Sequence, residues 1–171
     1  MDYVKVKRAV PILLFLFVFS LVVDNSFKLI SVAIADDLNI SVTTVSWQTT
    51  LAGLVIGIGA VVYSSLSDAI SIRTLFIYGV CLIIIGSVIG YIFQHQFAVI
   101  LAARIIQTAG LAAAETLYVI YVAKYLSKDD QKTYLGLSTS SYSLSLVIGT
   151  LSGGFISTYL HWTNMFLLAL I

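Results

Sequence analysis

The stretch YSSLSDAISIRTLF, residues 63–76, carries two charges, Asp68 and Arg73, between two uncharged apolar runs. WQTTLAGLVIGIGAVV precedes it at 47–62, and YGVCLIIIGSVIGYIF follows it at 78–93. A helix needs about 20 mostly apolar residues to cross about 30 Å of hydrocarbon, and each run reaches that length with its apolar neighbours. The stretch therefore predicts two membrane-spanning helices joined by a short polar turn.

The whole chain is too apolar to present a water-facing surface. It has 171 residues, of which 60% are hydrophobic and 10% are charged, whereas soluble domains carry about 25% charged residues. Lone strands cannot satisfy their backbone in lipid, so the apolar runs predict an all-α membrane protein. The net charge of +1 gives no reason to expect a nucleic-acid partner. The single cysteine, Cys81, offers neither a disulfide framework nor a metal cluster.

Five complete spans and the start of a sixth are expected from the apolar runs. The sixth run has ten residues, from Trp162 to Ile171, which is about 15 Å of helix and half of a membrane. We therefore expect residues 1–171 to form a single bundle that is a fragment of a longer protein. The expected spans are 9–35, 47–66, 74–93, 97–123 and 133–157, with the incomplete sixth at 162–171.

The basic residues outside these spans predict the orientation of the bundle. They lie at the N-terminus and in alternate loops, and cytoplasmic loops carry the excess of lysine and arginine. The N-terminus is therefore predicted to be cytoplasmic, and His95 and His161 are predicted to be ordinary loop residues on the outside. The basic residues are Lys5, Lys7, Arg8, Arg73, Lys124, Lys128 and Lys132.

Four ionisable residues fall within the expected spans, namely Asp24, Lys28, Arg104 and Glu115. A charge inside a membrane costs about 2.5–3.5 kcal/mol, so each is a functional candidate. Counted along the helices, Asp24 is about 16 Å below its outer end, and Lys28 and Arg104 are about 10 Å below theirs. Glu115 is about 27 Å down its helix, near the cytoplasmic surface.

Asp24 and Arg104 are predicted to form a contact between the first and fourth spans. The only acid on the helix of Arg104 is Glu115, eleven residues on, and Asp24 is the acid closest to Arg104 in depth. Such a contact would line a polar path. A second interpretation stays open, because Asp24 and Lys28 have the i, i+4 spacing of a pair that neutralises itself on one helix.

Small residues predict close packing of the spans. Glycines spaced by four allow helix backbones to approach one another in lipid. The serine-rich segment at 139–145 has two interpretations, since its hydroxyls can bond back to their own helix or line a wet cavity. The glycine pairs are Gly53 with Gly57, Gly86 with Gly90, and Gly149 with Gly153.

Three motifs along the chain resemble signatures of the major facilitator superfamily. The opening stretch resembles the loop signature between the second and third spans, with serines at 64 and 71 in place of glycines; the matching residues are Leu66, Ser67, Asp68 and Arg73. LAARIIQTAGLAAAE at 101–115 resembles the fourth-span signature, with Thr108 in place of a glycine; the matching residues are Arg104, Gln107, Gly110, Ala112 and Ala113. IGTLSGGF at 148–155 resembles the fifth-span antiporter signature, with Thr150 in place of proline; the matching residues are Gly149, Gly153 and Gly154.

The resemblance is strongest to the fourteen-span drug:proton antiporter branch, and within it to tetracycline efflux proteins. It implies a bundle of which the C-terminal half is missing. It further implies a cytoplasmic gating loop at Leu66, Ser67, Asp68 and Arg73, and a helix bend or packing role for Gly110, Gly149, Thr150, Gly153 and Gly154. Proton coupling and transport would involve Asp24, Lys28, Arg104, Gln107 and Glu115.

The function expected from these features is proton-coupled efflux of amphipathic drugs, tetracyclines first, across the cell membrane. The proton gradient would be the only driving force, with no cofactor, because the chain has no phosphate-cradling loop and no metal-ligand spacing. The partners would be the drug, protons, the lipid bilayer and the C-terminal half. Two alternatives stay open, a symporter or uniporter for a lipid or metabolite, and a membrane scaffold without transport activity. An enzyme is not expected, because no catalytic arrangement is visible.

Overall fold

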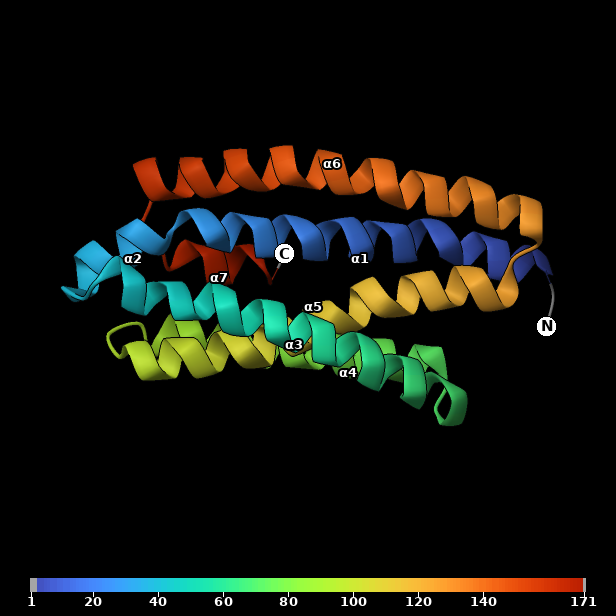
Figure 1. The fold of residues 1–171 in the computed structure, drawn as a ribbon, viewed down its shortest axis with the longest axis horizontal. Helices are drawn as coiled ribbons and strands as arrows, with labels where there is room; N and C mark the ends of the chain where they lie inside the picture. Colours follow the sequence, from blue (N-terminus) through green and yellow to red (C-terminus); the bar gives the residue numbers. More distant parts are fainter. Residues whose placement is uncertain (1–2, 171) are drawn as a thin grey trace.

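The computed structural model describes residues 3–170, and within this range the chain forms seven helices and no strand (Figure 1). The predicted all-α fold is confirmed. The helices are α1 (Tyr3–Leu29), α2 (Ser31–Leu38), α3 (Val42–Ala69), α4 (Ile72–Ile92), α5 (Phe97–Tyr125), α6 (Lys128–Tyr159) and α7 (Asn164–Leu168).

The number of complete spans differs from the five that were expected. Within the described residues, four helices are long and apolar enough to cross a membrane, namely α1, α3, α4 and α5. The expected span at 133–157 lies within α6, whose first turns are charged and whose length is rich in serine and threonine. The expected sixth span, 162–171, contains only the five-residue helix α7, and Ile171 lies outside the described residues.

The helix boundaries follow from local capping. Ser41, Ser71 and Ser127 precede α3, α4 and α6, and each side chain accepts a hydrogen bond from a backbone N–H in the first turn. Ser71 therefore begins α4 immediately after the turn that the opening stretch predicted. The expected first span, 9–35, is divided, because α1 ends at Leu29 and α2 begins at Ser31.

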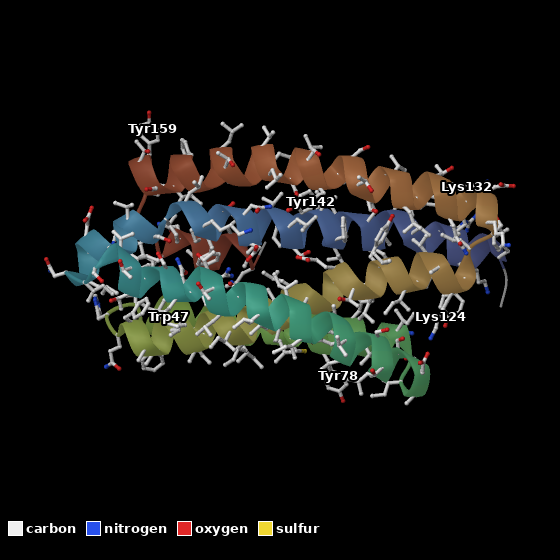
Figure 2. All side chains as sticks on the ribbon, viewed as in Figure 1. Trp47, Tyr78, Lys124, Lys132, Tyr142 and Tyr159 are labelled. Carbon is white, nitrogen blue, oxygen red and sulfur yellow. The ribbon has the colours of Figure 1, made fainter. Side chains whose placement is uncertain are left out.

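The helices run back and forth, so alternate connections share one end of the bundle (Figure 1). At one end, Lys7 Nζ lies 3.0 Å from an oxygen of Asp130, which joins the start of α1 to the start of α6. At the other end, Trp162 Nε1 donates to Asp37 Oδ2 at 2.9 Å. Lys124 and Lys132 both lie at the first end (Figure 2). The predicted gathering of basic loop residues at one end is confirmed.

Two helix seams depend on glycine. In the seam between α1 and α6, a Cβ at Gly149 would lie 2.8 Å from Asn25 Cβ, and one at Gly153 would lie 2.6 Å from the Ser26 carbonyl oxygen. In the seam between α4 and α5, a Cβ at Gly86 would lie 2.5 Å from the backbone nitrogen of Gln107. Distances this short leave no room for any larger residue.

The third glycine pair does not pack as predicted. A Cβ added at Gly53 or Gly57 would meet no atom within 4 Å. Instead α3 approaches α5 through Gly59, where a Cβ would lie 2.8 Å from that of Ala112. Spacing by four identified residues that can pack closely, but it did not identify which face of α3 meets a neighbour.

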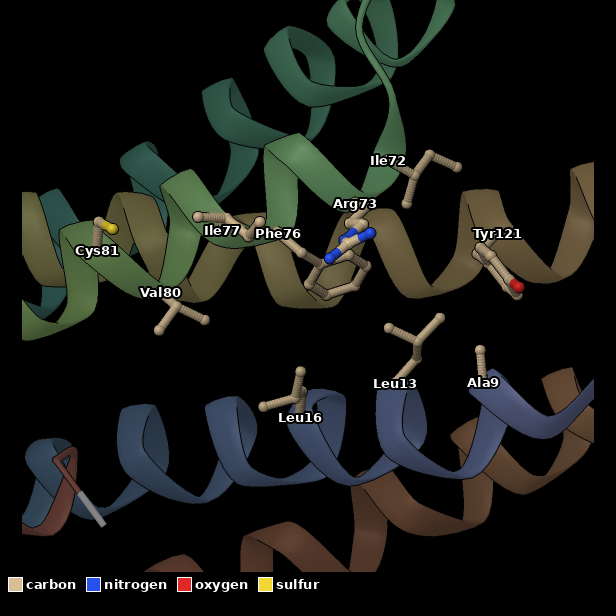
Figure 3. A pocket seen from close by; sticks show the side chains of 10 residues that line it. All are labelled: Ala9, Leu13, Leu16, Ile72, Arg73, Phe76, Ile77, Val80, Cys81 and Tyr121. Atoms are coloured by element: carbon tan, nitrogen blue, oxygen red, sulfur yellow. The ribbon is translucent and has the colours of Figure 1, made fainter. Parts of the chain in front are cut away.

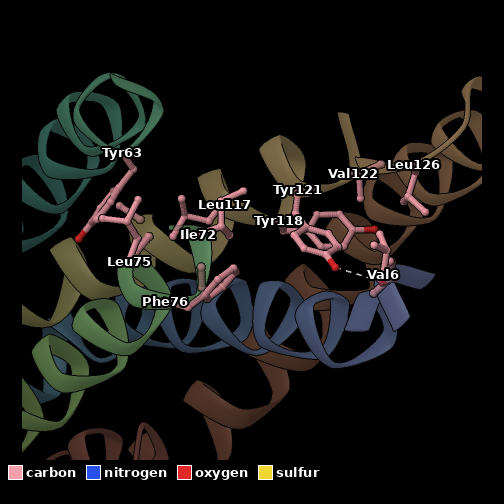
Figure 4. Packing of buried hydrophobic residues seen from close by; sticks show 14 residues of the cluster. Val6, Tyr63, Ile72, Leu75, Phe76, Leu117, Tyr118, Tyr121, Val122 and Leu126 are labelled. Atoms are coloured by element: carbon pink, nitrogen blue, oxygen red, sulfur yellow. Dashed lines mark hydrogen bonds between the residues drawn. The ribbon is translucent and has the colours of Figure 1, made fainter. Parts of the chain in front are cut away.

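An apolar cluster fills the basic end of the bundle between α1, α4 and α5 (Figure 4). Leu117, Tyr118 and Val122 of α5 are fully buried in this cluster. The hydroxyl of Tyr121 donates to the carbonyl oxygen of Val6 at 3.2 Å, which gives the phenol a partner inside the apolar region. A second cluster, around Phe27, Phe166, Met165 and Leu111, packs the other half.

The outer surface of the bundle is apolar. Large side chains on several helices, such as Phe15, Val61 and Leu151, are exposed by 67–68%. An exposed apolar surface of this extent is incompatible with water and matches the hydrocarbon of a bilayer.

Candidate functional site

The last third of α1 carries a run of buried polar side chains that face the other helices. Ser20, Asp24, Asn25 and Ser26 are all buried, although the helix is otherwise apolar. Since an unpaired polar group in an apolar interior is costly, each of these side chains needs a partner. Ser26 finds one on α6, where its hydroxyl donates to the carbonyl oxygen of Gly149 at 2.9 Å.

Asp24 and Arg104 form an ion pair between α1 and α5, and the predicted contact is confirmed. Arg104 Nη2 lies 3.0 Å from Asp24 Oδ1, and the exposed fractions of the two side chains are 2% and 10%. An ion pair this deeply buried is held by both charges together, because removing one leaves the other without compensation.

Arg104 has further partners that fix its guanidinium in place. Its Nη1 donates to Gln107 Oε1 at 2.6 Å, and Gln107 Nε2 donates to Ser87 Oγ of α4 at 2.9 Å. Its Cζ lies 4.0 Å from the centre of the Phe27 ring, a cation–π distance. The network therefore links α1, α4 and α5 through one side chain.

Lys28 completes the pairing of Asp24. Lys28 Nζ lies 3.0 Å from Asp24 Oδ2, and it donates to Asn25 Oδ1 at 2.9 Å. The two interpretations of Asp24 that the sequence left open are thus both correct, since one carboxylate oxygen meets Arg104 and the other meets Lys28.

Glu115 lies closer to Asp24 and Lys28 than the depth counted along its helix predicted. A cavity of about 240 Å³ is lined by residues of four helices, and Glu115 shares it with Asp24 and Lys28. Glu115 Oε1 accepts from Ser20 Oγ at 3.5 Å, one turn along α1 from Asp24. The residues that line this cavity, which we call the polar cavity, are Leu21, Asp24, Asn25, Lys28, Ile56, Glu115 and Tyr142.

Depth counted along each helix separated Glu115 from Asp24, but the two side chains reach one cavity. Glu115 contacts Ser20, which lies four residues, about 6 Å of helix, from Asp24 towards the basic end of α1. Glu115 belongs to the same polar cavity and not to a separate cytoplasmic surface.

Three buried side-chain atoms near this network have no hydrogen-bond partner among the described residues. They are Arg104 Nε, Gln48 Oε1 and Thr108 Oγ1. Gln48 reaches α1 from α3, where its Nε2 donates to the Phe27 carbonyl oxygen at 3.4 Å and to Ser31 Oγ at 3.2 Å. The core around Arg104 is therefore polar on several sides.

The opening stretch places Asp68 against α5 and not against Arg73. Lys124 Nζ lies 2.6 Å from Asp68 Oδ1, and it also donates to the Ser67 carbonyl oxygen at 3.2 Å. Lys124 thus meets both an acid and a free carbonyl in the last turn of α3, where a cation is favourable. Leu66 lies in the same turn and is partly exposed.

Arg73 lies at the edge of an apolar trough between α1 and α4 (Figure 3). The trough has a volume of about 630 Å³, and Leu13 and Leu16 of α1 face Phe76 and Val80 of α4 across it. None of its ten lining residues is acidic. Among the described residues Asp68 pairs with Lys124 and not with Arg73.

The fifth-span signature forms a helix seam. Gly149 and Gly153 contact α1, whereas Thr150 is exposed and a Cβ at Gly154 would meet no atom within 4 Å. The helix runs unbroken from Lys128 to Tyr159 through all four positions. Gly110 of the fourth-span signature packs against Gly79 and Ile83 of α4.

Two hydroxyls of the serine-rich segment bond to their own helix. Thr139 donates to the Leu135 carbonyl oxygen, as the preceding Ser138 does, and Ser145 donates to that of Tyr142. Tyr142 itself lines the polar cavity and lies midway along the bundle (Figure 2). Sequence reasoning missed Tyr142, because nothing in the spacing of α6 shows which side of the serine-rich segment faces the cavity.

Other contacts were also missed. Lys124 is predicted from the sequence only as a basic loop residue, although its position at the end of α5 could have suggested a partner in the turn at 67–71. For His161, which is predicted to be an ordinary loop residue, Nε2 lies 3.6 Å from Asp37 Oδ2. Within residues 3–170, no group of three His, Cys, Asp or Glu side chains could hold a metal ion.

Comparison with known proteins identifies the fold family. The profile of the Major Facilitator Superfamily matches residues 12–171. The chain is 31% identical over 121 residues to "Uncharacterized MFS-type transporter YwfA" of Bacillus subtilis (strain 168), covering 71% of this chain and 29% of that protein. It is 26% identical over 165 residues to "Uncharacterized MFS-type transporter YtbD" of the same organism, covering 94% of this chain and 41% of that protein. The chain thus spans less than half the length of these two relatives.

Proposed function

The chain belongs to the major facilitator superfamily, and we propose that it is the N-terminal bundle of a secondary transporter that exports amphipathic drugs in exchange for protons. Membership of the superfamily makes it a multi-pass membrane transport protein. The observation that carries the finer proposal is the buried ion pair between Asp24 and Arg104 beside a polar cavity. Ionisable groups kept inside a membrane bundle mark substrate and proton pathways.

The polar cavity is suited to an amphipathic substrate that is partly cationic. Asp24 is already paired with Lys28, which also lines the cavity, so the carboxylate open to a cation is that of Glu115. Leu21, Ile56 and Tyr142 contribute apolar and aromatic surface. A binding site of this kind combines apolar walls with a few placed polar groups. Tetracyclines, to whose efflux proteins the motifs are most similar, are the first substrates to test.

Transport would follow from two bundles that rock around a central site. Superfamily transporters bind substrate near the middle of the membrane, between two halves. The matched relatives are more than twice as long as the regions that this chain covers, which leaves room for a second bundle. The cell membrane, with the basic end of the bundle in the cytoplasm, is the location that the loop charges favour.

The turn between α3 and α4 would act as the cytoplasmic gate. Asp68 is 76% exposed although it pairs with Lys124, so it stays accessible to a second bundle. In this proposal Lys124 orients Asp68, and Leu66 and Ser67 form the turn of helix that presents it. Arg73 lies at the edge of the apolar trough, and in this proposal it contacts the membrane surface and not the second bundle.

Transport in everted membrane vesicles tests the proposal. Respiration acidifies the vesicle interior, so an antiporter should accumulate tetracycline or ethidium inside, and a protonophore should release it. Asp24→Asn should abolish this accumulation while the protein remains in the membrane. Movement of substrate in the same direction as protons would indicate a symporter instead. If Arg104→Ala altered folding and the intact protein moved none of these substrates, a scaffold would be the better interpretation.

A further inference from the structure

We propose that Glu115 is the carboxyl group that releases a proton when a cationic group enters the polar cavity, whereas Asp24 stays ionised throughout. This inference rests on the proposed function, because it names the residue through which protons and a cationic substrate would compete. It is carried by the different surroundings of the two carboxyl groups.

Both oxygens of Asp24 are already occupied by cations. Oδ1 lies 3.0 Å from Arg104 Nη2, and Oδ2 lies 3.0 Å from Lys28 Nζ. A proton or a substrate cation could reach this carboxylate only by displacing one of the two side chains. Displacing Arg104 would leave a buried guanidinium without its charge partner, which is strongly unfavourable.

Glu115 has no such partner. Among the described residues it forms no ion pair, and its one hydrogen bond is the 3.5 Å contact with Ser20 Oγ. That hydroxyl also donates to the Phe17 carbonyl oxygen at 2.8 Å, which is the shorter contact. The oxygens of Glu115 are therefore available to a proton or to a cation in the cavity.

The charged groups around Glu115 are distributed over the helices that enclose it. From α1, Asp24 and Lys28 share the cavity; from α6, Tyr142 does; and α3 contributes only Ile56. On α5 itself, Arg104 is bound to Asp24. Tyr142 offers an aromatic ring beside the carboxyl group, and such rings attract cations.

The net charge of the four ionisable side chains at this site favours an exchange of one proton for one cation. With Asp24, Glu115, Lys28 and Arg104 all ionised, the two negative and two positive charges cancel. Protonating Glu115 raises the total to +1, and releasing that proton while a monovalent cation binds also gives +1. The exchange thus keeps constant the net charge held in a poorly solvated region, where a change of charge is costly.

The proton step is simple. The O–H bond of the Glu115 carboxyl group breaks, the proton leaves through water, and the carboxylate pairs with the ammonium or amidinium group of the ligand. In the reverse step a proton from water replaces the cation. No oxidant, cofactor or metal takes part.

Infrared difference spectroscopy of the purified protein in lipid vesicles tests this inference without any transport measurement. A change of pH should reveal the C=O stretch of a protonated carboxyl group. Glu115→Gln should remove this band, Glu115→Asp should shift it, and the exposed variant Asp129→Asn should leave it unchanged. A band that persists in Glu115→Gln would overturn the proposal.

Proton release on ligand binding provides the second measurement. In weakly buffered solution, ethidium should release about one proton per molecule bound to the wild-type protein, and none when bound to Glu115→Gln. If Glu115→Gln still released a proton and Asp24→Asn did not, Asp24 would be the exchanging group and the inference would be wrong. A protein that shows the Glu115 band but no transport would refute the proposed function and leave this inference standing.

Discussion

Asp24 is bound by cations on two sides, and the two partners are not equivalent. Arg104 is almost completely buried, whereas 46% of the Lys28 side chain is exposed. Lys28 can therefore exchange its contact for water, and Arg104 cannot. The buried member of the pair should dominate the energetics of this site.

Asp24→Asn should lower the free energy of unfolding by about 3–5 kcal/mol, because it leaves the Arg104 guanidinium buried without a carboxylate. Arg104→Gln should cost less, since Asp24 keeps its contact with Lys28. The double variant should be more stable than the sum of the single changes predicts. Thermal unfolding in detergent, followed by tryptophan fluorescence, measures all three.

Asp129→Asn is the matched control for this series. Its carboxylate is 97% exposed and lies 3.6 Å from Lys132, so neutralising it should not change the unfolding midpoint measurably. If Asp24→Asn were as harmless as Asp129→Asn, the buried pair would contribute no stability.

At this scale the sequence predicted one partner of Arg104, Asp24, but not the rest of the site. An ionisable residue at depth in an apolar helix must find a partner, which made Asp24 the natural choice. The position of Glu115 was misjudged, because depth counted along a helix axis ignores the cavity into which the side chains of two helices extend. Tyr142 and Ser87 could not be found, since hydroxyls on apolar helices do not reveal which neighbour they meet.

The seam between α1 and α6 is held together by small residues. Both helices approach so closely that Gly149 and Gly153 contact the backbone of α1, and Ser26 donates across the seam. Such contacts compensate for the absence of a hydrophobic driving force between helices in lipid. The neighbouring Gly154 points to open space and has no such role.

Gly153→Ala should therefore destabilise the protein by about 1–3 kcal/mol, because its Cβ would press against the Ser26 carbonyl oxygen. Gly154→Ala should be neutral or stabilising by up to about 1 kcal/mol, because alanine is the better helix former. Unfolding midpoints of the two variants, one residue apart, provide the comparison. An equal gain of stability in both would show that helix propensity, and not the seam, decides the outcome.

The turn between α3 and α4 should matter more for transport than for stability. The pair of Asp68 and Lys124 is exposed by 76% and 40%, and exposed pairs contribute little to folding. Asp68→Asn should leave the unfolding midpoint nearly unchanged but reduce the rate of substrate accumulation in vesicles. Asp129→Asn, at the same end of the bundle, should change neither; a fall in stability that matches the fall in rate would remove the gating role.

For the molecule as a whole, alternation of the helices is the main organising feature. It places the start of α1, the turn at 70–71 and the connection at 126–127 at one end, together with the basic loop residues (Figure 1). This arrangement was predictable, because each apolar run must cross and return. The number of spans was not, because the run at 133–157 was counted as a fifth span by its length, whereas α6, rich in hydroxyl groups, is not among the four helices apolar enough to qualify.

Cysteine labelling in intact cells measures the orientation of this arrangement. In a Cys81→Ser background, His95→Cys should react with a membrane-impermeant maleimide added from outside. Lys132→Cys, whose parent side chain is 81% exposed at the opposite end, should react only after the membrane is permeabilised. The reverse pattern would place the basic end outside and contradict the loop-charge prediction.

The equal numbers of acidic and basic side chains around the polar cavity determine whether the pH difference or the electrical potential across the membrane can drive transport. If one proton is exchanged for one monovalent cation, no net charge crosses the bilayer in a transport cycle, and the electrical potential performs no work. Vesicles treated with nigericin, which dissipates the pH difference, should lose all accumulation of ethidium. Vesicles treated with valinomycin and potassium, which dissipate the potential, should keep it.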